Sequence, residues 1–309
     1  MIVLEDTKAA YRLYRVKRQE LPKNSYILCS DLSRVILYNP HIAGKTLQER
    51  MEGLSPIFVK IATEKALKGT PFEDVVEFVL LAGGLYYNIA DGFRKVHDYA
   101  PPQCFLGIKR QRVEGSEGQF RAVSTYENFE SLPKNSSVVI GDTIATGATI
   151  IRAIGDLERA VEEKDGKLNK LIICSLACST EGARRIKKME DRLKETNKDF
   201  ELFLIVAEQF FHLMPDGTDL RFLREDSLMP DETRAFTLER YGEFLGREMK
   251  CAVFDWGTRC KNPKKHYTEF LEFAESILKN PAADEKAKGE IKRMISEINE
   301  EMKIFRKTF

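Results

Sequence analysis

The segment of the chain most suggestive of chemistry is residues 138–150, VVIGDTIATGATI, where an acid and a run of small and hydroxylic residues follow a β-branched stretch. The β-branched residues favour a parallel strand that is buried on both faces, with Asp142 at its carboxyl end. Small residues let backbone N–H groups approach an anion closely, and threonine hydroxyls add further donors. This pattern predicts a phosphate site.

The residues after this loop predict a helix that would strengthen such a site. Apolar side chains recur with helical spacing through residues 150–163, so free N–H groups and the positive end of the helix dipole would converge on the loop. A nearby anion gains about 0.3–1 kcal/mol from such a dipole. The loop lacks the lysine of GxxxxGK[ST] and the spacing of GxGxxG, which disfavours nucleoside triphosphates and dinucleotides. The structural alternative is an ordinary strand-turn-helix connection.

This segment resembles the ribose-5-phosphate signature of the phosphoribosyltransferases that use phosphoribosyl pyrophosphate. The resemblance implies that Asp142 holds the ribose hydroxyls. The residues that it implies for the 5-phosphate loop are Thr143, Ala145, Thr146, Gly147, Ala148 and Thr149. A second acid usually precedes the first in that signature, and this chain has Gly141 there.

Further blocks in the same order resemble the uracil phosphoribosyltransferase branch of that family. They are residues 75–93 (VVEFVLLAGGLYYNIADGF), 106–112 (LGIKRQR), 124–133 (STYENFESLP), 171–186 (LIICSLACSTEGARRI) and 254–259 (FDWGTR). The pyrophosphate loop that the resemblance implies is Ala82, Gly83 and Gly84. Its cationic donors are Lys109 and Arg110. The nucleobase loop would be Phe254, Asp255, Trp256, Gly257, Thr258 and Arg259. The residues expected to take part in catalysis are Arg110, Asp142 and Asp255.

The chain also departs from the uracil branch at contacts that define it. Gly141 and Asp142 reverse the order of that branch, which keeps the first acid and has proline at the second position. Phe254 replaces a glycine of the nucleobase loop, and about forty extra residues lie between Phe210 and Cys251, more than most loops contain. Ala145 replaces the aspartate of hypoxanthine-guanine enzymes, which argues against a 6-oxopurine and leaves adenine open. The single tryptophan, Trp256, could stack on a base or fill the core.

The chemistry of phosphoribosyl transfer suits these residues. The reaction develops an oxocarbenium ion and a leaving pyrophosphate, so it needs charge stabilisation more than a covalent nucleophile. Magnesium is the expected counter-ion, because it is a hard cation that one or two carboxylates can hold together with oxygens of the substrate. The sequence therefore predicts a magnesium-dependent transferase that acts on a nucleobase, with uracil preferred. The alternatives are another base or a regulator that binds phosphoribosyl pyrophosphate without consuming it.

Alternating strand-like and helical patterns predict an α/β protein with a mostly parallel sheet flanked by helices, as the resemblance to the type I phosphoribosyltransferase fold also implies. The expected strands are residues 75–81, 104–108, 138–140, 171–176, 202–206 and 251–254. A transferase domain would span 1–262, with a helical N-terminal part over about 1–70, including a helix at 47–67. Residues 110–126 would form a mobile loop over the cleft. A helical extension would span 263–309, as two helices separated by 279–281.

Composition excludes other classes of function. The net charge of +1 gives no basic field for nucleic acid, and no apolar run approaches the ~20 residues that span a bilayer. The N-terminus has no signal-peptide pattern, so we expect a cytoplasmic protein. The 6 cysteines and 4 histidines lack the spacing of a zinc site, a disulfide framework or a hydrolytic metal site. The resemblance also implies a homodimer or higher homo-oligomer.

Overall fold

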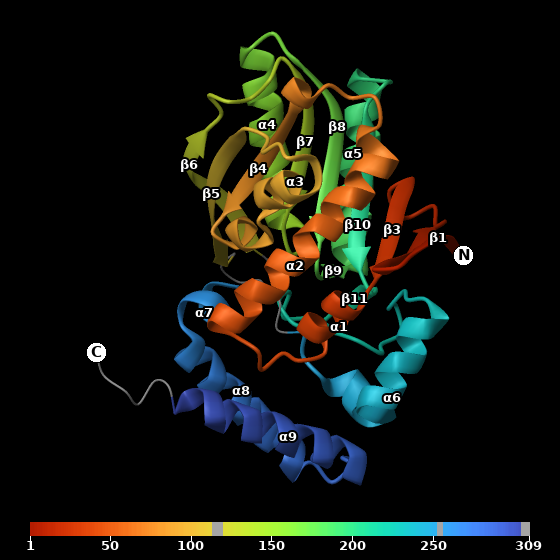
Figure 1. Cartoon of the computed structure of the whole chain (residues 1–309), viewed down its shortest axis with the longest axis vertical. Coiled ribbons are helices and arrows are strands. Elements are labelled where there is room, and N and C mark those ends of the chain that lie inside the picture. Colours follow the sequence, from red (N-terminus) through yellow and green to blue (C-terminus); the bar gives the residue numbers. More distant parts are fainter. Residues whose placement is uncertain (113–119, 252–255, 304–309) are drawn as a thin grey trace.

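The computed structural model describes residues 1–112, 120–251 and 256–303 (Figure 1). Within these ranges the main sheet has nine strands in the order β1-β2-β3-β10-β8-β7-β4-β5-β6. Its interior strands, from β3 to β5 in that order, pair in parallel, and β1, β2 and β6 add antiparallel edges. The predicted α/β fold with a mostly parallel sheet is confirmed, and the carboxyl ends of the parallel strands meet at one edge.

The strands of the main sheet are β1 (Ile2–Lys8), β2 (Tyr11–Val16), β3 (Asn24–Cys29), β4 (Val75–Leu81), β5 (Gln103–Arg112), β6 (Phe120–Asn128), β7 (Asn135–Gly141), β8 (Lys167–Ser175) and β10 (Glu201–Ala207). A smaller sheet consists of β12 (Leu220–Arg221), β11 (Phe210–Leu213) and β9 (Cys178–Ser179). The strands expected at 75–81, 104–108, 138–140, 171–176 and 202–206 coincide with β4, β5, β7, β8 and β10. Most of the strand expected at 251–254 lies outside the described residues, and Cys251 itself belongs to no strand.

Helices cover both faces of the main sheet (Figure 1). On one face lie α2 (Gly44–Ala62) and α3 (Ile89–His97), and on the other lie α4 (Ala148–Glu163) and α5 (Thr180–Thr196). Strand β7 shows why: Val139 packs in the same cluster as Phe58 of α2, whereas Val138 and Ile140 pack with Ile154 of α4. Because alternate side chains of a strand point to opposite faces, a continuous β-branched run suits a strand buried on both sides.

The C-terminal helices lie beyond the carboxyl ends of the parallel strands (Figure 1). They are α6 (Asp231–Glu248), α7 (Trp256–Lys261), α8 (Pro263–Lys279) and α9 (Glu285–Met302). The two predicted tail helices are therefore present as α8 and α9. Phe270 and Ile291 are buried in the same hydrophobic cluster as Phe58, so the tail packs onto the rest of the chain. None of the helices in the described ranges is long and apolar enough to cross a membrane.

The first thirty residues correct one expectation, because they form β1, β2 and β3 instead of a helical part. In β2 the side chains of Tyr11 and Leu13 are buried and Arg12 is exposed, which is the two-residue period of a strand with one covered face. Helices begin only at α1 (Asp31–Leu37). The helix expected at 47–67 is present as α2, which continues into a π-helical turn, η1 (Thr63–Leu67).

Residues 110–126 correct a second expectation, because most of the predicted mobile loop is strand. Strands β5 and β6 pair antiparallel, and Arg110 lies opposite Ala122 and Lys109 opposite Val123. The residues of β6 that follow Ala122 include valine, threonine and tyrosine, which favour strands. Residues 113–119 lie outside the described residues.

Candidate active site

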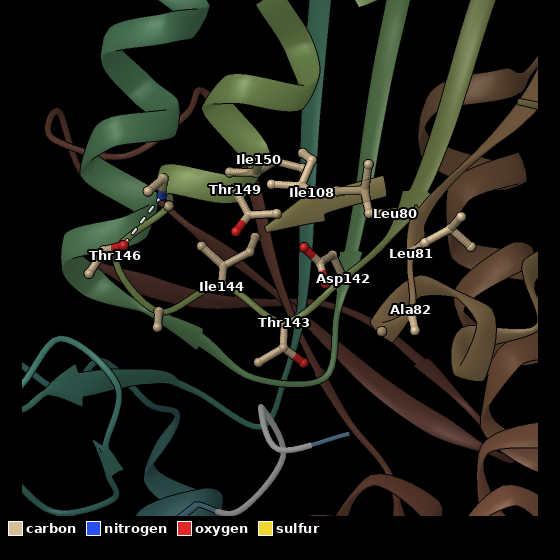
Figure 2. A pocket seen from close by; sticks show the side chains of 14 residues that line it. Leu80, Leu81, Ala82, Ile108, Asp142, Thr143, Ile144, Thr146, Thr149 and Ile150 are labelled. Atoms are coloured by element: carbon tan, nitrogen blue, oxygen red, sulfur yellow. Dashed lines mark hydrogen bonds between the residues drawn. The ribbon is translucent and has the colours of Figure 1, made fainter. Parts of the chain in front are cut away.

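A cavity of about 210 Å³ lies where the loop after β7 meets the turn after β4 (Figure 2). Its lining residues are Leu80, Leu81, Ala82, Gly83, Ile108, Asp142, Thr143, Ile144, Ala145, Thr146, Gly147, Ala148, Thr149 and Ile150. Figure 2 shows Asp142 and Thr149 turned toward the middle of the cavity, with the Ala82 turn on one side. The structure thus brings together two segments, 60 residues apart in the chain, that the sequence predicts to bind phosphate groups.

The loop after β7 is held by backbone hydrogen bonds to the neighbouring strand end. The Ile144 N–H donates to the Ala177 carbonyl (2.9 Å), and the Ser179 N–H donates to the Ile144 carbonyl (2.8 Å). The Ser179 hydroxyl donates to the Ala145 carbonyl and accepts from the Gly182 N–H (2.7 Å). These bonds fix the loop against the start of α5, so its shape exists before any ligand arrives.

Helix α4 begins in this loop with a backbone conformation that only glycine adopts easily. Gly147 is the N-cap and has φ +77°, a left-handed conformation that lets the chain turn sharply into the helix. The first N–H groups of a helix have no intrahelical acceptor, and the positive end of the dipole lies there. Thr146 and Thr149 add hydroxyls to the same cavity wall. This end of the cavity is suited to an anion.

Asp142 supplies the charge on the cavity wall. It follows the last residue of β7 and is 9% exposed, and its N–H donates to the Cys174 carbonyl at 3.1 Å. Among the lining residues that the structure describes, it is the one with an ionisable side chain. A carboxylate accepts hydrogen bonds from hydroxyls, and here it lies beside the start of α4, the anion seat of this cavity. The cavity is therefore matched to a ligand that carries hydroxyl and phosphate groups together.

The turn after β4 forms the opposite wall. Ala82 and Gly83 line the cavity, and the Leu81–Ala82 peptide bond is cis. Residues Gly83–Tyr87 form a short 3₁₀ helix, η3, in which the Leu85 N–H donates to the Ala82 carbonyl at 3.3 Å. Gly84 lies behind the wall, where a Cβ atom would be 3.1 Å from the Gly141 carbonyl oxygen. The two loops are therefore in direct contact at Gly84 and Gly141.

Sequence reasoning missed Tyr87, which is fully buried between these loops. Its ring packs so closely on Gly141 that a Cβ atom there would lie 2.4 Å from the Tyr87 Cβ. Its hydroxyl accepts the Leu176 N–H at 2.9 Å and lies 3.1 Å from the Thr143 hydroxyl. An aromatic pair after a double glycine was the available signal in the sequence, but it has no fixed meaning without the fold.

Of the two cations predicted beside the pyrophosphate, Lys109 is the one whose side chain the structure describes. Lys109 is exposed on β5 and does not line the cavity. The backbone of Arg110 continues the same strand, and its side chain lies outside the described part of the structure. Phe254 and Asp255 also lie outside the described residues, and only the backbone of Trp256, Gly257 and Thr258, at the start of α7, is described.

Arg259 is the one residue of the predicted nucleobase loop whose side chain the structure describes. Its side chain is fully buried and is not among the residues lining the cavity. The guanidinium donates to the carbonyl oxygens of Asn39 (2.8 Å), Ile36 (3.3 Å) and Ile42. Burial lowers the pKa of Arg259 to about 10. Arg259 thus ties α7 to the end of α1 through Nε and Nη2, while Nη1 has no hydrogen-bond partner among the described residues, and its assignment to the nucleobase loop stays a prediction.

Comparison with known proteins gives a partial likeness. No family model matches the chain, and no curated protein matches it. Among solved structures, adenine phosphoribosyltransferase from Trypanosoma brucei, in complex with AMP, pyrophosphate and ribose-5-phosphate, aligns at a TM-score of 0.40 and 16% identity, over 62% of this chain and 86% of that one. A hypoxanthine phosphoribosyltransferase mutant from Trypanosoma cruzi aligns at 0.33 and 16%, over 61% and 91%. The Staphylococcus aureus hypoxanthine enzyme aligns at 0.28 and 19%, over 41% and 62%. At these values the function has to be argued from the site of this chain.

Proposed function

We propose that this protein binds phosphoribosyl pyrophosphate in the cavity at Asp142 and transfers its phosphoribosyl group to a nucleobase. One observation carries the proposal. The sequence separates Asp142 and the start of α4 from the glycine turn that follows β4. In the structure all three line the same cavity. Ligands of parallel α/β sheets bind at this edge, outside the carboxyl ends of the strands.

Different lining residues would bind different parts of phosphoribosyl pyrophosphate. The N–H groups and hydroxyls of residues 146–149 would receive the 5-phosphate at the start of α4. Asp142 would accept hydrogen bonds from the ribose hydroxyls, and Ala82 and Gly83 would present backbone groups to the pyrophosphate. In the transfer, the bond from the anomeric carbon to the pyrophosphate oxygen breaks, a bond from that carbon to a ring nitrogen of the base forms, and the proton of that nitrogen passes to water or to the departing pyrophosphate. The Asp142 carboxylate then stabilises the positive charge that develops on the ribose.

The carboxylate at the cavity suits a magnesium ion that is held jointly by the protein and by the phosphate oxygens of the substrate. No group of three or more His, Cys, Asp or Glu side chains in the described ranges is arranged to hold a metal ion. Magnesium commonly binds through one or two carboxylates together with phosphate oxygens. Asp142 would contribute that carboxylate, and the bound ion would neutralise charge on the leaving pyrophosphate.

The acceptor is proposed to be uracil, with another base as the alternative. At position 145 the cavity wall is an alanine, so no acid or base there can exchange a proton with a purine. This favours acceptors that need no such group, among them uracil and adenine. The resemblance of residues 75–93 and 106–112 to the uracil branch supports uracil over adenine.

The test is consumption of phosphoribosyl pyrophosphate with magnesium, assayed separately with uracil, adenine, guanine, hypoxanthine, xanthine and orotate. Pyrophosphate and nucleotide should both appear with uracil and should disappear when magnesium is chelated. Formation of nucleotide from a different base would support phosphoribosyl transfer and overturn the preference for uracil. The observation that favours the second candidate, a non-catalytic regulator, is Gly141, which leaves Asp142 without an acidic neighbour in the chain. That candidate predicts binding of phosphoribosyl pyrophosphate without release of pyrophosphate.

A further inference from the structure

Tyr87 connects the two loops that form the candidate active site. It lies at the end of η3, three residues after Gly84, and its side chain is fully buried. The ring fills the space that a side chain at position 141 would occupy. On the far side of Gly141, its hydroxyl reaches Thr143, which lines the cavity next to Asp142. One side chain therefore spans from the predicted pyrophosphate turn to the predicted ribose-phosphate loop.

The hydrogen bonds of Tyr87 are directional. A backbone N–H can only donate, so the Tyr87 oxygen accepts from Leu176 (2.9 Å). The Tyr87 hydroxyl also hydrogen-bonds the Thr143 hydroxyl at 3.1 Å, where either group can donate, and it interacts with Ser175 as well. Burial raises the pKa of Tyr87 well above its ordinary value, so the phenol stays neutral and keeps its proton. A neutral hydroxyl at this point orients Thr143 without adding charge to the cavity.

We propose that Tyr87 is a positioning residue, whose hydroxyl sets the orientation of Thr143 and thereby holds the Asp142 carboxylate in register with the anion seat at the start of α4. Where ligand binding is concerned, this inference rests on the proposed function. The competing account is that the ring only fills the core beneath Gly141. The two accounts differ in the role of the hydroxyl, because removing the oxygen leaves the ring in place.

The experiment compares Tyr87→Phe with the matched control Tyr99→Phe, which removes an exposed hydroxyl that donates to the Phe72 carbonyl at 3.2 Å. Ribose 5-phosphate is titrated calorimetrically into each folded variant. We expect Tyr87→Phe to raise its Kd about tenfold, the change that the loss of one well-placed hydrogen bond produces, and Tyr99→Phe to leave it unchanged. A Kd within about twofold of the wild type for Tyr87→Phe would overturn the proposal.

A double-mutant cycle tests whether Tyr87 acts through Thr143. If it does, Thr143→Val should raise the Kd for ribose 5-phosphate to a similar extent. The Kd of the double variant should then be no higher than that of the weaker-binding single variant. Fully additive losses would show that the hydroxyl does not act on Thr143 and would contradict the proposed route.

A measurement without ligand separates this proposal from the proposed function. Amide hydrogen exchange in residues 142–149 should be faster in Tyr87→Phe than in the wild type, while exchange within α4 beyond its first turn should be unchanged. Equal exchange in both proteins would overturn the positioning role. If the wild type bound no ribose 5-phosphate but exchange still changed, the proposed function would fail and the mechanical role of Tyr87 would stand.

Discussion

In the loop after β7 the Asp142 carboxylate and the start of α4 face a cavity, whereas in α7 the Arg259 guanidinium is buried among backbone carbonyls. The sequence resembles a phosphoribosyltransferase motif in both places. The loop keeps its shape through the left-handed conformation of Gly147, which the local sequence encodes, and through hydrogen bonds to Ala177 and Ser179 at the end of the neighbouring strand. The environment of Arg259 is made by α1 and the chain after it, more than 200 residues away. A motif therefore records the glycine that shapes a loop, but neither the distant backbone that holds the loop nor the distant partners of a long side chain.

The largest effect should come from Arg259→Met, which keeps an aliphatic side chain but removes the donors to three carbonyl oxygens. We expect the free energy of unfolding to fall by about 3 kcal/mol or more, because buried acceptors lose their partners. Urea denaturation measures it. Arg192→Met, which breaks an exposed pair with Glu158, is the control and should cost less than about 1 kcal/mol. Unchanged stability would contradict this structural role, and a raised KM for the base would support the nucleobase assignment.

Asp142→Asn tests the other region. The substitution keeps the size of the side chain and removes its charge, so the fold should persist while kcat/KM falls about 100-fold, or about 2.7 kcal/mol of transition-state stabilisation. Steady-state kinetics with phosphoribosyl pyrophosphate measures the loss, and Asp199→Asn, at an exposed surface pair with Lys167, serves as the control. Wild-type turnover in a folded Asp142→Asn protein would remove Asp142 from the site.

The helical region around Arg259 should also respond to pH. His41 is buried, and burial, with the charges of Arg293 and Arg259, lowers the pKa of His41 to about 4, although Glu297 opposes the shift. The folded state then holds His41 neutral where the unfolded state binds a proton. The free energy of unfolding should therefore fall as the pH drops from about 6.5 to about 4, by at most about 3 kcal/mol.

Denaturation at several pH values measures this dependence, and His41→Gln should flatten it over that window. Glu297 has a lowered pKa in the fold, so its own contribution is lost only at the acid end of the range. An identical pH dependence in wild type and His41→Gln would contradict the assignment.

The smallest effects concern the contact between the two loops. Gly141→Ala would place a Cβ atom 2.4 Å from the Cβ of Tyr87 and should destabilise the protein by about 1–2 kcal/mol through overpacking. Gly155→Ala in α4 meets no atom within 4 Å and should instead stabilise the helix by about 0.5–1 kcal/mol. Thermal denaturation compares the two variants. Equal melting temperatures would show that Tyr87 does not enforce glycine at position 141.

Much of the fold was predictable because it depends on local pattern. The β-branched run of β7 and the helical spacing after it identified the site loop, and the tail helices followed from their own periodicity. Strand β1 was missed because most of its side chains are exposed and a bulge between Leu4 and Asp6 interrupts the two-residue period, whereas β2 shows that period and could have been predicted from it. Tyr87 was missed, and the carbonyl partners of Arg259 were not foreseen, for a common reason: a side chain's surroundings depend on burial by distant segments, which a motif does not record.

The central claim is that the cavity at Asp142 is built for a phosphorylated ribose. The most direct test is a calorimetric titration of the whole chain with ribose 5-phosphate and, separately, with ribose. The account predicts saturable binding of ribose 5-phosphate, much weaker binding of ribose, and a marked loss of ribose 5-phosphate affinity in Asp142→Asn. Equal affinity for the two sugars, or affinity for ribose 5-phosphate that Asp142→Asn leaves unchanged, would contradict it.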